Sequence, residues 1–184
     1  MALGREEIVC KALDVLDEVG LEGLTTRRLA AELGVKGPSL YWHFKNMGEL
    51  RAFMAEALLE AVMPAPDALP GDWRGWLAEG ARGIRRAALS RRDGARVLAG
   101  ARPTGQSRTL SFTAMAARLE REGFAAREAR RVLTALARYA LGWALGEQAE
   151  RRPSETADAD FEFGLQAMLA GLAAGRTVPL RAAR

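Results

Sequence analysis

The side chains best suited to chemistry are concentrated in residues 25–46, where hydroxyl, cationic and aromatic groups follow one another closely. Arginine and lysine bind phosphate oxygens, while hydroxyl groups and aromatic rings can contact sugars and the edges of bases. The only histidine of the chain, His43, lies in the same stretch. The pattern is therefore suited to holding a nucleic acid rather than to breaking bonds.

Residues arranged for catalysis or for metal binding are nearly absent. The chain has one histidine and one cysteine, Cys10, which excludes a Cys/His metal cluster and an internal disulfide. It contains no Ser-His-Asp set and no glycine-rich phosphate loop after a strand. Asp93-Gly94 is interpreted as a helix-terminating turn. We expect no enzyme activity, no catalytic residue, no metal site and no cofactor, although acidic side chains brought together only by folding remain an alternative.

Two short helices around a glycine-containing turn would position the groups of residues 25–46. Thr25 is a favourable N-cap, because its hydroxyl can accept from a free backbone N–H. Gly34 supplies the left-handed residue that ends the first helix. The second helix is predicted from Pro38 to Phe44, since proline suits the first helical position. This is the layout of a helix-turn-helix DNA reader.

A tight turn between two helices also occurs in many helical proteins that bind no DNA. Two features favour DNA binding here. The second helix begins with the hydroxyl of Ser39, so its N-terminal end could approach base edges and phosphates. It also presents the aromatic residues Tyr41 and Trp42, which a plain solvated face has little reason to carry. The alternative is that Tyr41 and Trp42 pack inside the protein, Trp42 in part.

The basic charge of the N-terminal region is local. The chain carries a net charge of +4, yet residues 1–51 hold seven basic and eight acidic side chains. Within residues 25–46 the basic side chains outnumber the acidic ones: Arg27, Arg28, Lys36 and Lys45 stand against Glu32. This distribution predicts phosphate contacts at one defined site rather than the nonspecific binding of a general polycation.

Two separate segments resemble the tetracycline-repressor (TetR) family. Residues 20–30 and 40–46 resemble its N-terminal domain, and the run Tyr-Trp-His-Phe-Lys-Asn at 41–46 is very similar to the end of its recognition helix. Leu-Ser-Arg-Arg-Asp-Gly-Ala-Arg-Val at 89–97 and Gly-Ala-Arg-Pro-Thr at 100–104 resemble the effector domain of the tetracycline repressors proper. The wider family does not share that second segment, so the resemblance covers most of the chain.

The resemblance implies which residues contact DNA. Thr26 and Arg27 match positions that touch a phosphate and a base, and residues 38–43 match the recognition helix. The predicted DNA-contact residues are Thr25, Thr26, Arg27, Lys36, Gly37, Pro38, Ser39, Tyr41, Trp42, His43 and Lys45.

Several of these positions depart from the tetracycline repressors. Ser39 replaces a threonine and keeps the hydroxyl, whereas Gly37 replaces a glutamine, Lys36 an acidic residue and Met47 a basic one. Glutamine can read adenine through two hydrogen bonds, and glycine cannot. Lys36 offers an additional phosphate or guanine contact. The sequence therefore predicts DNA binding to a different operator.

The drug-contact residues of the tetracycline repressors are mostly replaced at the matching positions of this chain. They hold a magnesium-chelated drug with histidine, asparagine, phenylalanine, glutamine and glutamate side chains, and the metal-ligating histidine corresponds to Leu98. We expect a more apolar cavity, with Arg102 at its mouth. Its predicted lining is Leu58, Met63, Trp76, Gly80, Ile84, Leu98, Arg102, Phe112, Met115, Leu136 and Trp143. The alternative for the apolar members is that they only fill the core.

Apolar periodicity predicts an all-α chain with an N-terminal three-helix head and a C-terminal helical effector and dimerisation domain. Besides the two short helices, segments are expected at 5–19, 48–62, 72–89, 94–101, 106–121, 126–150 and 158–174. Cys10 is expected on the apolar side of the first of these. The predicted organisation is 1–46 for the DNA-binding domain, 47–70 for a connecting helix and linker, 71–175 for the effector domain and 176–184 for a tail.

The two late helices, 126–150 and 158–174, are rich in alanine, glycine and leucine over more than one face. Such a helix needs a second surface to cover it. We expect a homodimer through four helices, two from each subunit, with both helices simply filling one core as the alternative. A symmetric pair of readers would also extend the recognised sequence.

The combined expectation is a transcriptional regulator, a repressor, that binds double-stranded operator DNA as a homodimer and is released by a small apolar effector other than magnesium-tetracycline. A shift of helix 48–62 would connect the cavity to the reader. The alternative is a helical effector module that acts through a protein partner. No run of 18 apolar residues occurs, so we expect a cytoplasmic protein with no membrane partner.

Overall fold

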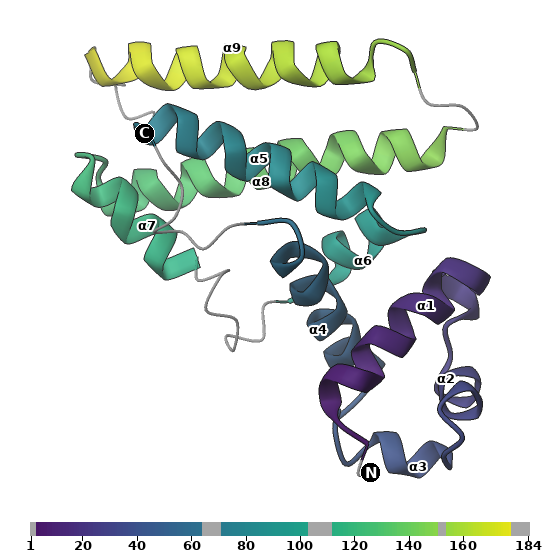
Figure 1. Ribbon diagram of the computed structural model, residues 1–184. Helices are drawn as coiled ribbons and strands as arrows, with labels where there is room; N and C mark the ends of the chain where they lie inside the picture. Colours follow the sequence, from purple (N-terminus) through teal and green to yellow (C-terminus); the bar gives the residue numbers. More distant parts are fainter. Residues whose placement is uncertain (1–2, 64–70, 103–111, 151–153, 178–184) are drawn as a thin grey trace, which may run out of the picture.

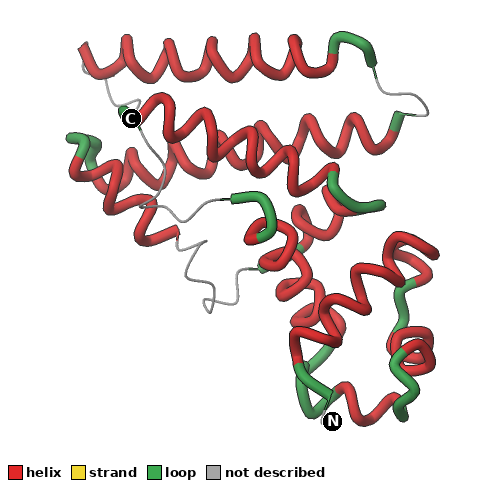
Figure 2. The backbone as a smooth tube through the Cα atoms, in the orientation of Figure 1, coloured by secondary structure: helices red, strands yellow, loops and turns green. Residues whose placement is uncertain are grey.

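The computed structural model describes residues 3–63, 71–102, 112–150 and 154–177, and all regular structure within these ranges is α-helical (Figures 1 and 2). The prediction of an all-α fold is confirmed. The helices of this part are α1 (Arg5–Gly23), α2 (Thr26–Glu32), α3 (Gly37–Leu40), α4 (Met47–Glu60), α5 (Trp73–Leu89), α6 (Gly94–Gly100), α7 (Phe112–Arg121), α8 (Ala126–Ala149) and α9 (Ala157–Thr177). None of them is long and apolar enough to cross a membrane.

The helices form a small head and a larger body that α4 joins. Helices α1, α2 and α3 make the head, while α5, α8 and α9 run side by side in the body (Figure 1). Helix α4 packs against α1 in the head and against α5 and α6 in the body. A movement of α4 would therefore change the packing of both the head and the body.

Side-chain caps fix where several helices begin. The Thr25 hydroxyl accepts from the backbone N–H of Arg28 at 3.2 Å and starts α2 as predicted. The Asn46 side chain does the same for Glu49 at 2.9 Å and starts α4. Asp72 caps α5 by accepting from Gly75 at 3.0 Å. These three local signals are readable in the sequence, and they set the ends of the elements that form the site.

Two apolar clusters make the core. The first joins the head to α4 and continues into the body, since Leu50, Met54 and Leu58 of α4 are buried in it together with Ala87, Ala88, Ala95 and Val97. The second is built from α5, α7, α8 and α9, with Leu119, Phe161 and Leu165 among its fully buried members. The first cluster crosses from head to body, so α4 is a packed structural helix rather than a loose tether.

Arg85 joins three helices of the body. Its Nε and Nη2 donate to the two carboxylate oxygens of Glu147 on α8, each at 2.7 Å. Its Nη1 lies 2.7 Å from Asp158 on α9, and the guanidinium lies 4.8 Å from the ring centre of Phe161. Hydrogen bonding to Glu147 raises the pKa of Arg85 above its ordinary value, so the side chain remains charged.

Helix ends differ from the prediction at two places in the head. The first helix was expected to end before Gly20, but α1 continues to Gly23 across a break at Gly20, where φ is 72°. The recognition helix was expected to reach Phe44, but α3 ends at Leu40. The N–H groups of Tyr41 and His43 donate to carbonyls three residues earlier, at 3.1 and 3.0 Å, so the chain continues as a tight turn.

Two further sequence expectations concern single segments. Cys10 is exposed, so its predicted place on the buried side of α1 is wrong. The buried positions of α1 centre on Ile8, Ala12 and Leu16, and the helical period puts position 10 nearly opposite to them. The predicted helix 106–121 is observed as α7 from Phe112, and residues 106–111 lie outside the described residues.

Candidate nucleic-acid interface and ligand cavity

The head presents five of the eleven predicted DNA-contact residues along one open groove between α2 and α3. The groove is lined by Thr26, Arg27, Ala30, Ala31, Val35, Gly37, Pro38 and Tyr41. Thr26 and Arg27 of α2 therefore share one surface with Gly37 and Pro38 of α3 and with Tyr41, which follows α3. The turn that separates the helices contains Gly34 at φ 66°, the left-handed conformation that glycine adopts without strain.

The aromatic residues after α3 are the most exposed of the head. Trp42 is 88% and Tyr41 is 56% solvent-exposed. The alternative that Trp42 packs partly inside the protein is therefore wrong for this chain. Apolar rings that stay in water at the edge of a short helix are available to a partner surface.

Free cationic groups surround the same groove. Arg27, Lys36 and Lys45 are exposed, and none of them has an ion pair with another described residue. Arg28, by contrast, lies 3.2 Å from Glu18 and 2.9 Å from Glu32. The three unpaired cations can meet phosphates, whereas Arg28 holds α2 against α1.

Buried aromatic packing supports the recognition turn from behind. Phe44 is 4% exposed, and its ring meets that of Phe53 on α4 edge-on at 5.6 Å. Arg5 lies 4.7 Å from the ring centre of Phe53 and donates to the carbonyl of His43 at 3.3 Å. The position of α3 therefore depends on the position of α4.

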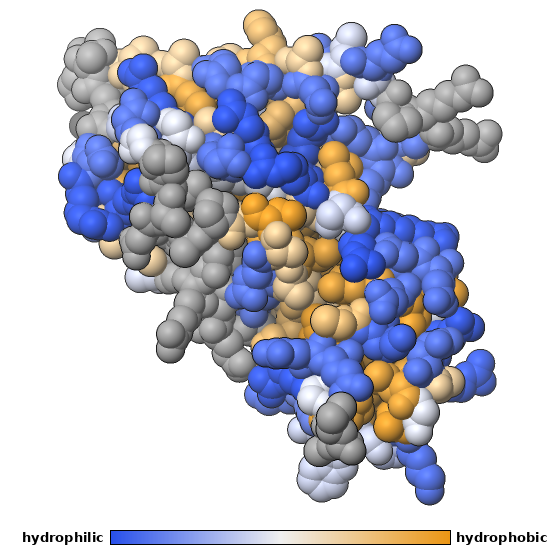
Figure 3. Space-filling model, viewed as in Figure 1, coloured by the Kyte–Doolittle hydropathy of each residue, from blue (hydrophilic) through white to orange (hydrophobic). Residues whose placement is uncertain are grey.

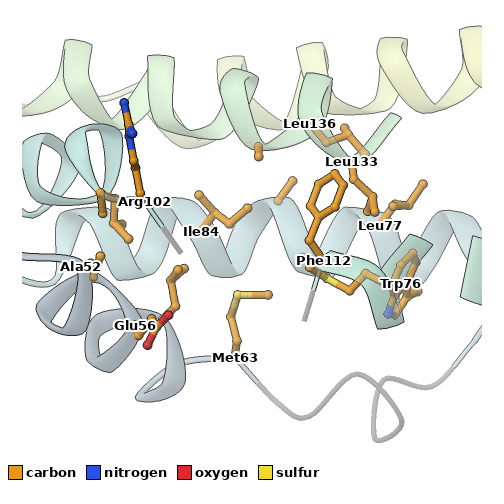
Figure 4. Close-up of a pocket in the computed structure, with 18 residues that line it drawn as sticks. Ala52, Glu56, Met63, Trp76, Leu77, Ile84, Arg102, Phe112, Leu133 and Leu136 are labelled. Atoms are coloured by element: carbon orange, nitrogen blue, oxygen red, sulfur yellow. The ribbon is translucent and has the colours of Figure 1, made fainter. Parts of the chain in front are cut away.

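The body contains a cavity of about 250 Å³ between α4, α5, α6, α7 and α8 (Figure 4). Nine of the eleven predicted cavity residues line it: Met63, Trp76, Gly80, Ile84, Leu98, Arg102, Phe112, Met115 and Leu136. They come from segments far apart in the sequence, so the fold brings together what the family resemblance grouped.

Two predicted cavity residues lie elsewhere. Leu58 is 3% exposed and belongs to the core between head and body, while its neighbour Leu59 faces the cavity. Trp143 lies two helical turns beyond Leu136, where its ring meets Tyr139 and Phe161 at 6.4 and 6.3 Å. It lines a separate hollow beside α9 with Gly142 and Gly146. Neither side chain can contact a molecule in the cavity.

The wall that α4 contributes to the cavity was missed. Ala52, Ala55, Glu56 and Leu59 line the cavity from this helix. With Met63 they follow the three- and four-residue spacing of one helical face. That spacing was readable in the sequence, but an acidic residue in an otherwise apolar stripe obscured it.

The lining is apolar with few polar groups. Glu56 and Arg102 are the charged side chains among the described lining residues, and Figure 4 shows them toward the same end of the cavity. Trp76, at the other end, is 2% exposed, and its Nε1–H has no hydrogen-bond partner among the described residues. Those residues contain no group of three His, Cys, Asp or Glu side chains able to hold a metal ion.

A polar contact region connects the end of α1 to the turn between α5 and α6. Asp93 accepts from the N–H of Leu21 at 2.8 Å, and the N–H of Arg92 donates to Asp17 at 2.9 Å. Arg91 also pairs with Asp17 at 2.6 Å. A Cβ at Gly20 would lie 2.9 Å from the carboxylate of Asp93, so only glycine fits this break without rearrangement. Head and body are thus joined at a second place besides α4.

The chain matches two family descriptions and several characterised proteins. Residues 8–52 match bacterial regulatory proteins of the tetR family, and residues 64–157 match the tetracyclin repressor-like C-terminal domain. The tetracycline repressor protein class C of Escherichia coli is 41% identical over 157 residues, which cover 83% of this chain and 70% of that protein.

Solved structures agree over nearly the whole chain. A TetR variant from Acinetobacter baumannii AYE in complex with minocycline has a TM-score of 0.82 at 39% identity, covering 92% of this chain and 96% of that one. BioQ with its double-stranded DNA operator has a TM-score of 0.73 at 32% identity, covering 94% and 99%.

The two family matches fall on the two parts of the structure. One covers the head with its helix-turn-helix, and the other covers the body from α5 to α8. Proteins of this family are transcription regulators and not enzymes, in agreement with the lack of catalytic motifs in the sequence. The chain belongs to the TetR family: it is a helix-turn-helix DNA-binding repressor whose C-terminal domain is of the tetracycline-repressor type.

Proposed function

We propose that the protein is a homodimeric repressor that leaves its operator when an apolar small molecule fills the cavity of the body. The observation that supports this most directly is the double role of α4. Its residues Ala52, Ala55 and Leu59 line the cavity, while Leu50 and Met54 on the same helix are buried against the head. A ligand that displaces one face of α4 changes the packing of the other face.

DNA reading is assigned to the groove between α2 and α3. Arg27, Lys36 and Lys45 bind phosphates, and the segment from Pro38 to His43 enters the major groove. Gly37 has no side chain with which to read a base, so the operator differs from that of proteins with glutamine at this position. The exposed rings of Tyr41 and Trp42 make apolar contacts with thymine methyl groups or sugars.

The cavity does not fit a metal-chelated ligand. Magnesium is held by oxygen donors, or by histidine in the tetracycline repressors, and the described residues of the cavity wall include a single carboxylate, that of Glu56. The positions that the resemblance matches to the family's drug contacts are occupied here by Met63, Gly80, Ile84 and Leu98. We therefore assign the cavity to an apolar effector and not to magnesium-tetracycline.

A dimer through α8 and α9 completes the proposal. Helix α9 lies at the outer edge of the body and exposes Phe163 to 79%. Small residues continue the exposed stripe at 167, 170, 171 and 174, and α8 exposes Gly142 and Gly146 beside it. Pale and orange surface along this edge is visible in Figure 3. Small side chains let two such helix pairs pack closely in a four-helix interface.

Selection of bound sequences from a pool of random duplexes tests this function. The protein should enrich one palindromic sequence that differs from the tetracycline-resistance operator, and tetracycline with magnesium should not release it. Equal preference for the tetracycline-resistance operator, or release by magnesium-tetracycline, would contradict the assignment of operator and effector. A folded dimer that enriches no sequence would favour the alternative, in which the body acts through a protein partner.

A further inference from the structure

The indole N–H of Trp76 is a hydrogen-bond donor that the described part of the protein leaves unused. The side chain is 2% exposed, and Nε1 has no partner among the described residues. A buried donor without an acceptor costs free energy, and native structures contain few of them. Phenylalanine, although smaller, would bring no unpaired donor into this apolar site, so packing alone does not account for the indole N–H.

The neighbours of Trp76 in the cavity wall cannot supply the acceptor. Leu77, Met115 and Leu133 line the same region and offer no strong acceptor. The guanidinium of Arg118 lies 5.1 Å from the centre of the Trp76 ring, and it is itself a donor. No described neighbour therefore accepts from Nε1, and a molecule that fills the cavity beside Trp76 can supply the acceptor.

The polar groups of the cavity lie at its two ends. Figure 4 shows Trp76 at one end and Arg102 with Glu56 toward the other, with Ile84, Met63 and Phe112 between them. A ligand that satisfies this arrangement is apolar over most of its surface and has an oxygen acceptor where it meets Trp76. A plain hydrocarbon would leave the buried donor unpaired.

We propose that Trp76 determines the effector class: its Nε1–H binds a carbonyl oxygen of an apolar molecule enclosed by α4, α5, α7 and α8. The inference rests on the proposed function, because it takes the cavity as the effector site. It goes further by naming the recognising atom and the chemical group that it recognises.

The direct test uses two probes of nearly the same shape, 9-fluorenone and fluorene, of which only the first has a carbonyl oxygen. The four tryptophans give four indole N–H signals in a ¹H–¹⁵N spectrum. The Trp76→Phe variant identifies the signal of Trp76, and the three other single tryptophan variants identify it by elimination if that variant does not fold. Fluorenone should move this signal downfield, as hydrogen bonding does, and fluorene should not.

Affinities give the second readout. Water also binds a carbonyl, so the informative quantity is the ratio of the two dissociation constants in each variant. Trp76→Phe should weaken fluorenone relative to fluorene by about fivefold, the value of one ordinary hydrogen bond. Trp73→Phe is the matched control, because Trp73 lies on the same helix and packs on Phe124 outside the cavity wall. It should leave the ratio unchanged.

The outcomes separate the two proposals. One outcome is that both probes bind, but the Trp76 signal responds equally to both and the ratio of dissociation constants is the same in Trp76→Phe. The proposed role of Trp76 is then wrong, and the cavity remains an apolar binding site. If neither probe binds, the apolar effector cavity itself is refuted, and the role of Trp76 with it.

Discussion

At the scale of single residues, the exposed cations of the head differ from the paired ones in what they can bind. Arg28 is held by Glu18 and Glu32, whereas Arg27 has no ion pair among the described residues and lies beside Tyr41 in the groove between α2 and α3. A guanidinium without an acidic partner gains more from a phosphate, because no existing pair has to be broken.

Arg27→Ala should weaken operator binding about fivefold or more and lower the slope of log Kd against log salt by about one. The lost phosphate contact releases fewer counterions, which is why both quantities change. Titration of a fluorescent duplex at several salt concentrations measures them. Arg74→Ala is the control, since Arg74 is also exposed but lies on α5 in the body. If the two variants behave alike, Arg27 does not contact DNA.

The placement of single residues was the part best predicted from the sequence, and the errors in it have a common cause. The Thr25 cap and nine cavity residues are where the sequence and the family resemblance put them. Leu58 was assigned to the cavity although Leu59 occupies that wall, a rotation of about 100° on one helix. A sequence shows which residues are apolar, but two neighbouring apolar residues on α4 can face two different partners.

At the scale of helices, the turn between α5 and α6 holds the end of α1 through Asp93. This residue has φ 54°, a left-handed conformation that is costly for most side chains, and its carboxylate accepts from the N–H of Leu21. The break at Gly20 lies against the same carboxylate. The sequence identified Asp93-Gly94 as a turn, but not its contact with a helix more than 70 residues earlier, which only the folded chain creates.

Substitutions at Asp93 should destabilise the protein in a fixed order. Asp93→Ala loses the acceptor and strains the backbone, at a cost of about 1–3 kcal/mol. Asp93→Gly also loses the acceptor but relieves the strain, so its cost should fall in between, while Asp93→Asn keeps an acceptor and tolerates the conformation, so its cost should be smallest. Urea unfolding measures all three. An alanine variant as stable as the parent would show that this contact does not hold the head.

The ion pair between Arg82 on α5 and Glu162 on α9 makes stability depend on pH. Hydrogen bonding from Arg82 lowers the pKa of Glu162, so the carboxylate is more acidic in the folded than in the unfolded chain. The ion pair therefore stabilises the folded chain at neutral pH. This stabilisation is lost as the pH falls below about 4.3, the pKa of glutamate in the unfolded chain, and through the lower pKa of Glu162 in the folded chain.

Glu162→Gln should therefore lower the free energy of unfolding at about pH 6, and the difference from the parent should shrink at about pH 3. Urea titrations at both values measure this. Glu155→Gln is a suitable control, because Glu155 is exposed and has no ion pair with another described residue. A difference that is the same at both pH values would mean that the pair does not stabilise the contact of α5 with α9.

At the scale of the whole molecule, the proposed function requires two copies of the head at a fixed separation. One short α3 contacts few base pairs, whereas two related by symmetry read half-sites about one DNA turn apart. The α8 and α9 surfaces are the proposed means of pairing. The sequence indicated this surface through helices that are apolar over more than one face, but it gives no coordinates for a second subunit.

Ala170→Arg should separate the dimer, because a long charged side chain would stand in the exposed small-residue stripe of α9. The matched control is Ala117→Arg, an exposed alanine on α7 outside that stripe. Sedimentation velocity should give the mass of one chain for the first variant and of two chains for the second. If both variants remain dimers, the interface lies elsewhere on the protein.

The most direct measurement of the central claim is the mass of the complex with its selected duplex, determined by sedimentation equilibrium at low salt. The account predicts two chains on one duplex for the parent, and no complex for a folded variant that combines Arg27→Ala with Tyr41→Ala. A single chain on the duplex, or a double variant that binds as the parent does, would contradict it.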